Sequence, residues 1–262
     1  MMQLLKADLI KLSRSITPWI VFILASLSAV IFASSSHFVA TGNLNFETAA
    51  SSLSLFSETQ MIALLGSITV GIFLTKDFEN KIIENAISGG HSRNSIVINK
   101  IIIFIILTAS LYFPYVIITI IFAFQDTTFS SFIPTPTLNI LAEAAQQEVT
   151  AELIGKILLT SGLSLIIFIS QLMISIFYMF LFKKAVFVIA ATYMTSLILG
   201  PIASLNESIH SVMAYTPYGI DLSHLTLEMS GEFIAKSLII SFIFIFVLYL
   251  GTYFLFRRAE VK

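Results

Sequence analysis

Two pairs of residues carry side chains that could hold a metal ion. Glu207 precedes His210 by three residues, and Asp221 precedes His224 by the same interval. Carboxylate and imidazole groups are common ligands of divalent transition metals. Both pairs lie in one polar stretch, however, where solvated side chains are the simpler interpretation. We therefore predict no metal site.

The common motifs of enzymes are missing from the sequence. It contains no H-E-x-x-H zinc motif, no G-x-S-x-G elbow and no G-x-x-x-x-G-K-[ST] phosphate-binding loop. No polar stretch is long enough to form an ATPase domain. We expect a protein that is not an enzyme, that has no cofactor of its own and that does not bind nucleic acid. Any ATP hydrolysis must come from another polypeptide.

The composition indicates an integral membrane protein. Of the 262 residues, 57% are hydrophobic and 11% are charged, against roughly 45–50% and 25% in soluble domains. The mean hydropathy is +0.95. Cysteine is absent, so disulfides and thiolate metal sites are excluded. The expected fold is a single all-α transmembrane domain over residues 1–262.

Six stretches approach the length of about 20 apolar residues that a helix needs to cross a bilayer. We assign the spans to residues 18–36, 59–75, 101–124, 157–182, 185–205 and 237–256. None of them contains an ionisable residue, so no proton or sodium relay through the spans is expected. In the second span, Ser67 and Gly71 form a pair of small residues that would let another helix approach closely.

The first 15 residues predict an amphipathic helix in the membrane interface. An apolar stripe is opposed by cations that would face lipid phosphates. The stripe is Leu5, Leu9, Leu12 and Ile16, and the cations are Lys6, Lys11 and Arg14. A cleaved signal peptide is the alternative, because residues 33–35 resemble a small-residue cleavage site. The long lead-in with Asp8 argues against it.

The distribution of charge predicts the topology. Twelve of the 14 Lys and Arg residues fall in the N-terminus, the 76–100 loop, the Lys183-Lys184 turn and the tail. Ten of the 15 acidic residues fall on the opposite side. Since cytoplasmic loops carry the excess of cations, both termini and the 76–100 loop are expected in the cytoplasm of a cell-membrane protein. Five or seven spans would scatter the cations over both faces.

The two long outer loops differ in pattern. Loop 125–155 contains a helix-like segment, from Leu138 to Leu153, with an apolar side that suggests a helix resting on the bilayer surface. Loop 206–235 contains Tyr215, Pro217 and Tyr218, whose rings suit the headgroup region. We expect this second loop to be re-entrant.

The 76–100 loop is the longest polar interval on the predicted cytoplasmic side. Its pattern predicts one helix over residues 77–88, which ends at Gly89-Gly90, and Ser92 is a candidate N-cap for the next helix. The predicted buried stripe is Phe78, Ile82, Ile83, Ala86 and Ile87, and the predicted exposed residues are Glu79, Asn80, Lys81, Glu84 and Asn85. An ordinary connecting loop is the alternative interpretation.

This arrangement resembles the permease subunits of bacterial ABC-2 type ABC transporters. The resemblance lies in the topology and in two short runs, DFENK at 77–81 and SGGHSR at 88–93. It implies that the 77–88 helix is a coupling helix, which docks on a separate ATP-binding subunit. The implied interface consists of Asp77, Phe78, Glu79, Asn80, Lys81, Glu84, Asn85, Ser88, Gly89 and Arg93.

The same resemblance implies a function. Members of the family pair two six-span permeases, alike or different, with two ATPase subunits, and small members resemble those that export or confer immunity to antimicrobial peptides. Residues of the spans that either line a pathway or only pack include Tyr112, Tyr115, Gln171 and Tyr193. Two alternatives stay open: a membrane immunity or assembly protein that transports nothing and has no ATPase partner, and an intramembrane enzyme.

Overall fold

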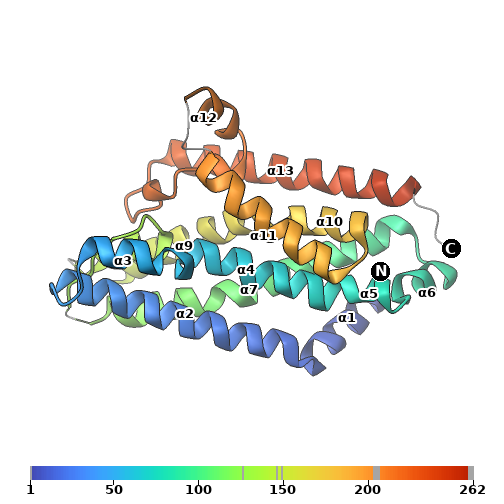
Figure 1. Ribbon diagram of the computed structural model, residues 1–262, viewed down its shortest axis with the longest axis horizontal. Coiled ribbons are helices and arrows are strands. Elements are labelled where there is room, and N and C mark those ends of the chain that lie inside the picture. Colours follow the sequence, from blue (N-terminus) through green and yellow to red (C-terminus); the bar gives the residue numbers. More distant parts are fainter. Residues whose placement is uncertain (1, 126, 146, 149, 203–206, 259–262) are drawn as a thin grey trace.

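The computed structural model describes the chain except for residues 1, 126, 146, 149, 203–206 and 259–262. Every regular element in the described part is a helix, and six helical segments are long and apolar enough to cross a membrane (Figure 1). This confirms the prediction of an all-helical protein with six candidate spans. The predicted end of the fifth span, at residue 205, lies outside the described residues.

The helices extend beyond most of the predicted boundaries. The first span is α2 (Ile16–Ala40), the third α7 (Arg93–Ala123), the fifth α11 (Ala185–Ile202) and the sixth α13 (Gly231–Arg258). The second combines α3 (Phe46–Leu53), η1 (Ser54–Phe56), α4 (Glu58–Thr69), the π-helix η2 (Val70–Thr75) and α5 (Lys76–Glu79). The fourth consists of α9 (Ala151–Leu172) and α10 (Ile174–Phe182).

Side-chain caps explain where several helices begin. The Ser92 hydroxyl accepts the Ser95 N–H at 3.2 Å, which confirms Ser92 as the N-cap of α7. Thr150 caps α9 in the same way, through the Leu153 N–H at 3.2 Å. Such caps satisfy backbone donors that a helix start leaves without partners.

The second, third and fourth spans form the interior of the bundle. They are the most buried of the six, whereas α11 and α13 bury little of their surface. In Figure 1, α2 and α13 lie on opposite sides of this interior. The apolar outer faces of α2, α11 and α13 suit contact with lipid.

Segments predicted to be cytoplasmic gather at one end of the bundle. Figure 1 places α1 (Met2–Arg14), α5, α6 (Ile82–Ser88), the turn between α10 and α11, and the end of α13 together. We call this the basic end, because these segments carry most of the cations, and the opposite one the acidic end. An even number of spans places both termini at the same end of the bundle, as observed.

The prediction of a surface helix over residues 138–153 is wrong. Instead, α8 (Pro136–Ala144) is short and almost wholly buried, and Leu153 belongs to α9. The Thr137 N–H bonds to Glu58 and the Asn139 amide to the Leu222 carbonyl at 2.9 Å, so the polar side of α8 also faces protein. The apolar stripe in the sequence predicted that only one side of this helix is buried. The other side of α8 is covered by groups from distant parts of the chain, which the stripe does not indicate.

The 206–235 segment folds back along the fourth span. It forms α12 (Glu207–Met213), η3 (Pro217–Gly219) and η4 (Leu222–His224). The Gln171 amide donates to the Pro217 carbonyl at 2.9 Å, and the Tyr218 hydroxyl donates to the Gln171 carbonyl at 2.7 Å. Gln171 lies within the fourth span, so this segment packs against that helix, and its depth in a membrane stays a prediction.

Candidate functional site

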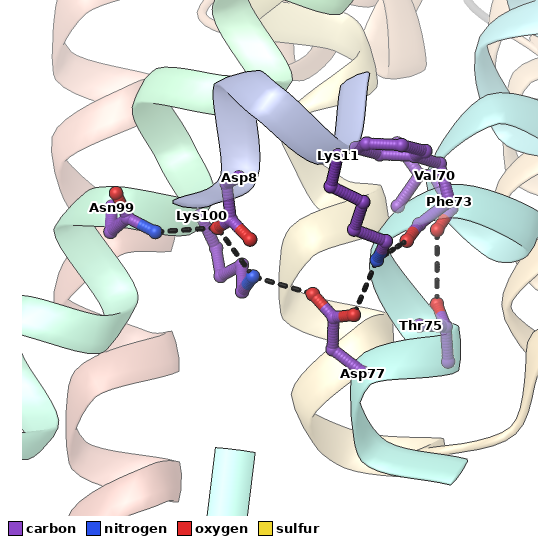
Figure 2. A network of polar contacts seen from close by, with 8 residues as sticks. All are labelled: Asp8, Lys11, Val70, Phe73, Thr75, Asp77, Asn99 and Lys100. Atoms are coloured by element: carbon purple, nitrogen blue, oxygen red, sulfur yellow. Dashed lines mark hydrogen bonds and ion pairs between the residues drawn. The ribbon is translucent and has the colours of Figure 1, made fainter. Parts of the chain in front are cut away.

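A cluster of charged and polar residues, most of them buried, joins three helices at the basic end (Figure 2). The Lys100 ammonium of α7 contacts Asp8 of α1 at 2.7 Å and Asp77 of α5 at 2.6 Å. Lys11, also on α1, pairs with the other oxygen of Asp77, and the Asn99 amide donates to Asp8 at 2.6 Å. We call these five residues the ion cluster. It connects the N-terminal helix α1 to α5 and α7, the helices at the two ends of the 76–100 loop.

Burial makes the partners in the ion cluster depend on one another. Lys100 is 4% exposed, Asp77 1% and Asp8 9%. A charge in such surroundings is costly unless it is paired and hydrogen-bonded. Two lysines balance two aspartates, so the cluster is neutral as a unit.

The π-helix η2 lies beside the ion cluster and contacts Lys11. Its wider turn begins at Val70, whose carbonyl accepts the Thr75 hydroxyl at 3.2 Å. The Phe73 carbonyl accepts the Lys11 ammonium at 3.0 Å, and the Lys11 nitrogen lies 4.6 Å from the centre of the Phe73 ring. Single π-helical turns occur frequently at functional sites.

The ion cluster corrects one prediction. Lys11 does not point to lipid phosphates but pairs with Asp77. The helices of the second and third spans also continue past the predicted bounds at 75 and 101, so they include Asp77 and Lys100. The predicted spans 59–75 and 101–124 themselves contain no Asp, Glu, Lys, Arg or His. A sequence does not show that the charges beyond them pair.

The predicted helix over 77–88 is divided in two. The first part, α5, ends at Glu79, and Lys81 takes a left-handed conformation with φ of 57° before α6 begins at Ile82. The backbone therefore turns between the two helices. Within the predicted stripe, Ile83 is buried, but Ile82 is 41% exposed on the surface of α6.

Four of the ten predicted interface residues hold the loop to the bundle. Asp77 belongs to the ion cluster, and the Phe78 ring packs against that of Phe180 at 5.2 Å. The Glu79 carboxylate accepts the Ala185 N–H at 2.9 Å, at the start of α11. Arg93 donates to the Phe256 carbonyl at 2.6 Å, near the end of α13.

The other six predicted interface residues form the outer surface of the loop. They lie between the two helices, on α6 and just after it. Glu84 is half-buried, and the exposed ones are Asn80, Lys81, Asn85, Ser88 and Gly89. Together with Ile82 they make a polar surface with one exposed apolar side chain, and we call these seven residues the α6 surface.

The four proposed pathway residues do not come together. Tyr112 and Tyr115 are buried and stack with ring centres 6.2 Å apart, and the Tyr115 hydroxyl donates to Ser28 at 3.1 Å. Tyr193 is half-buried on α11. Gln171 lines a cavity. The two tyrosines are buried in the core of this chain, and a role for them in a pathway stays a prediction.

Glu58 is a buried acid that directly precedes the predicted second span, 59–75. Its side chain is 0% exposed, one carboxylate oxygen accepts the Thr137 N–H at 2.8 Å, and the Tyr112 hydroxyl lies beside it. The signal in the sequence was an acid directly before an apolar stretch. That signal does not distinguish a buried residue from an exposed one.

Of the two acid–histidine pairs, only the side chains of Asp221 and His224 lie in the described part of the chain. No cluster of three or more ligating side chains is found there. Asp221 and His224 are exposed, with 3.8 Å between a carboxylate oxygen and the imidazole Nε2. Glu207 and His210 lie on α12, and the arrangement of their side chains is outside the described part.

Comparison with known proteins gives no assignment. No model of a protein family matches the chain, and no curated protein or solved structure matches it. The class that the helices define is a multi-pass helical membrane protein with six candidate spans.

Proposed function

We propose that the chain is the transmembrane permease subunit of an ATP-binding cassette exporter. It would pair with a second permease subunit and draw its energy from a separate ATPase on the cytoplasmic side of the cell membrane. The cargo class that best fits the resemblance is an antimicrobial peptide or a related amphiphile, which the permease would export or give immunity to. The basic end is then cytoplasmic, as the excess of cations there predicts.

The observation that supports this proposal most directly is the joining of the α6 surface to the spans. Residues on one side of α6, including Ile83 and Ile87, pack against the hydrophobic core. The ion cluster, Glu79 and Arg93 fix both ends of the same loop to α1, α7, α11 and α13. A movement of an ATPase subunit bound to the α6 surface would therefore move several helices together as a rigid body, as in other domain movements.

Glu84→Lys is expected to weaken binding of the ATPase subunit about tenfold or more and to reduce export in proportion. A charge reversal at an interface puts like charges together or leaves a buried partner unpaired. Glu84 is preferable to Glu79, because Glu79 also binds the start of α11. The measurement isolates the protein from its native membranes in mild detergent, identifies any ATP-binding protein that remains attached and follows export.

Glu228→Lys is the matched control, since it reverses the charge of an exposed glutamate near the acidic end. It should leave both the attached ATPase and export unchanged. The proposal is contradicted if Glu84→Lys retains its ATPase and its full export, or if no ATP-binding protein accompanies the wild-type chain. In the second case the non-transporting immunity or assembly protein becomes the better explanation.

A further inference from the structure

An apolar groove of about 470 Å³ lies between α13 and the first part of α7, in the half of the bundle nearer the basic end. One wall is a row of α13 residues at helical spacing, Phe242, Ile245, Phe246 and Tyr249, and the other consists of three isoleucines of α7. The Phe242 and Phe246 side chains are more than half exposed. We call this the α7–α13 groove. Because lipid tails are as apolar as these side chains, an acyl chain suits it.

A polar contact marks the end of the groove that is nearer the basic end. The Tyr249 hydroxyl donates to the Asn94 side-chain oxygen at 2.9 Å. Asn94 is exposed, and its amide N–H groups have no partner among the described residues. Tyrosine rings favour the level of the membrane at which apolar and polar groups meet. The groove is therefore apolar along its length and polar at one end, as a phospholipid is.

An accessible cation lies beyond this polar end. Tyr249, Tyr253 and Arg257 follow one another at intervals of four residues, so they lie along the same side of α13. The Arg257 side chain is exposed and forms no ion pair or hydrogen bond with another described residue. A second guanidinium, that of Arg93 on α7, donates to the Arg257 carbonyl at 2.7 Å. Both helices of the groove thus bring an arginine to its basic end, which favours an anion there.

We propose that the α7–α13 groove and Arg257 form a binding site for an anionic phospholipid. One acyl chain lies in the groove, the Asn94 amide donates to an ester or phosphate oxygen, and the phosphate pairs with Arg257. Tyr249 and Arg257 are about 12 Å apart along the helix, a distance that the glycerol and the first carbons of the chain can span. Basic sites between transmembrane helices bind anionic headgroups elsewhere. The site does not depend on the proposed permease function, because it requires neither ATP nor an ATPase.

The test uses the purified full chain in detergent, with its bound lipid removed, and counts added lipid molecules by native mass spectrometry. Phosphatidylglycerol and phosphatidylcholine with identical acyl chains are compared, since they differ in net charge but not in the part that enters the groove. The first phosphatidylglycerol should bind about fivefold more tightly than the first phosphatidylcholine, because a basic residue at the membrane surface favours an anionic lipid. Equal binding of the two lipids would overturn the proposal.

Arg257→Gln removes the cation that pairs with the phosphate. It should reduce the preference for phosphatidylglycerol over phosphatidylcholine at least threefold. Lys184→Gln is the matched control, because Lys184 is another exposed cation of the basic end but lies in the turn between α10 and α11. It should leave the preference unchanged. If both variants lose the preference equally, or if neither loses it, the preference does not come from this site and the proposal is overturned.

Ile102→Trp fills the groove from the α7 side, since Ile102 lines it and is half-buried. It should raise the dissociation constants of both lipids about fivefold, because the acyl chain loses apolar contact. Ile105→Trp places the same ring on α7 outside the groove, where Ile105 is exposed, and should change neither constant. Unchanged lipid binding by Ile102→Trp would overturn the proposal. So would a dimer that Ile102→Trp dissociates without loss of lipid, which would assign the groove to contact with a second copy of the chain.

Discussion

Replacement of Lys100 by Met is expected to lower the free energy of unfolding by about 3–5 kcal/mol, as for other buried ion pairs that lose one partner. Lys100 contacts Asp8 and Asp77 at 2.7 and 2.6 Å, and all three side chains are buried. Met fills a similar volume, so the loss of stability arises from the missing ammonium charge, which leaves the carboxylates of Asp8 and Asp77 with too little positive charge. Unfolding of the purified protein by increasing denaturant measures the change.

Lys156→Met serves as the control for that experiment. Lys156 also pairs with a carboxylate, that of Glu152 at 3.2 Å, but both side chains are accessible to solvent. Exposed pairs typically contribute at most about 1 kcal/mol, so this variant should lose little stability. Equal losses in the two variants would show that burial of the ion cluster is not what makes it costly to break.

A triple variant separates the stability of the ion cluster from its mechanical role. When Asp8→Asn and Asp77→Asn are added to Lys100→Met, both buried carboxylates are removed as well. No buried negative charge is then left unpaired, and most of the lost stability should return. The charged connection between α1, α5 and α7 is still missing. If that connection transmits movement from the α6 surface, the triple variant should unfold nearly like the wild type and yet export poorly. Full export would assign the ion cluster to stability alone.

The sequence predicted the six helices because each one carries its own signal. A run of about 20 apolar residues is sufficient to identify a span, and Ser92 as an N-cap is equally local. The short helix α8 was misplaced because its burial depends on Glu58 and on the Leu222 carbonyl. Neither neighbour can be inferred from a pattern within α8.

The candidate site was predicted less completely than the fold. The 76–100 loop was predicted to hold one helix over 77–88, and the pattern did not predict the left-handed Lys81 that divides this helix in two. The ion cluster brings together residues 8, 11, 77, 99 and 100. Its contacts span up to 92 positions of sequence, so only the folded chain reveals that these charges are buried together. The cavity lined by Gln171 depends in the same way on five separate segments.

Gly71→Ala is expected to destabilise the protein by about 1–3 kcal/mol, as overpacking of a well-packed interior does. A Cβ at this position would collide with Ile189 Cγ1 and would lie 3.1 Å from the Ala185 carbonyl oxygen. This close approach of α11 to the second span confirms the role predicted for the small residue Gly71. Thermal unfolding of the variant should show the loss even though alanine favours helices more than glycine does.

Two further substitutions show whether the loss arises from this contact. Ile189→Ala removes the side chain that the new Cβ would meet, so the double variant should be more stable than the sum of the two single changes by about 0.5–3 kcal/mol. Gly162→Ala adds the same Cβ within α9, where nothing lies within 4 Å. It should be neutral or stabilise by up to about 1 kcal/mol. A loss at Gly162 similar to that at Gly71, with no compensation by Ile189→Ala, would mean that the backbone of these helices, and not the approach of α11, is sensitive to the change.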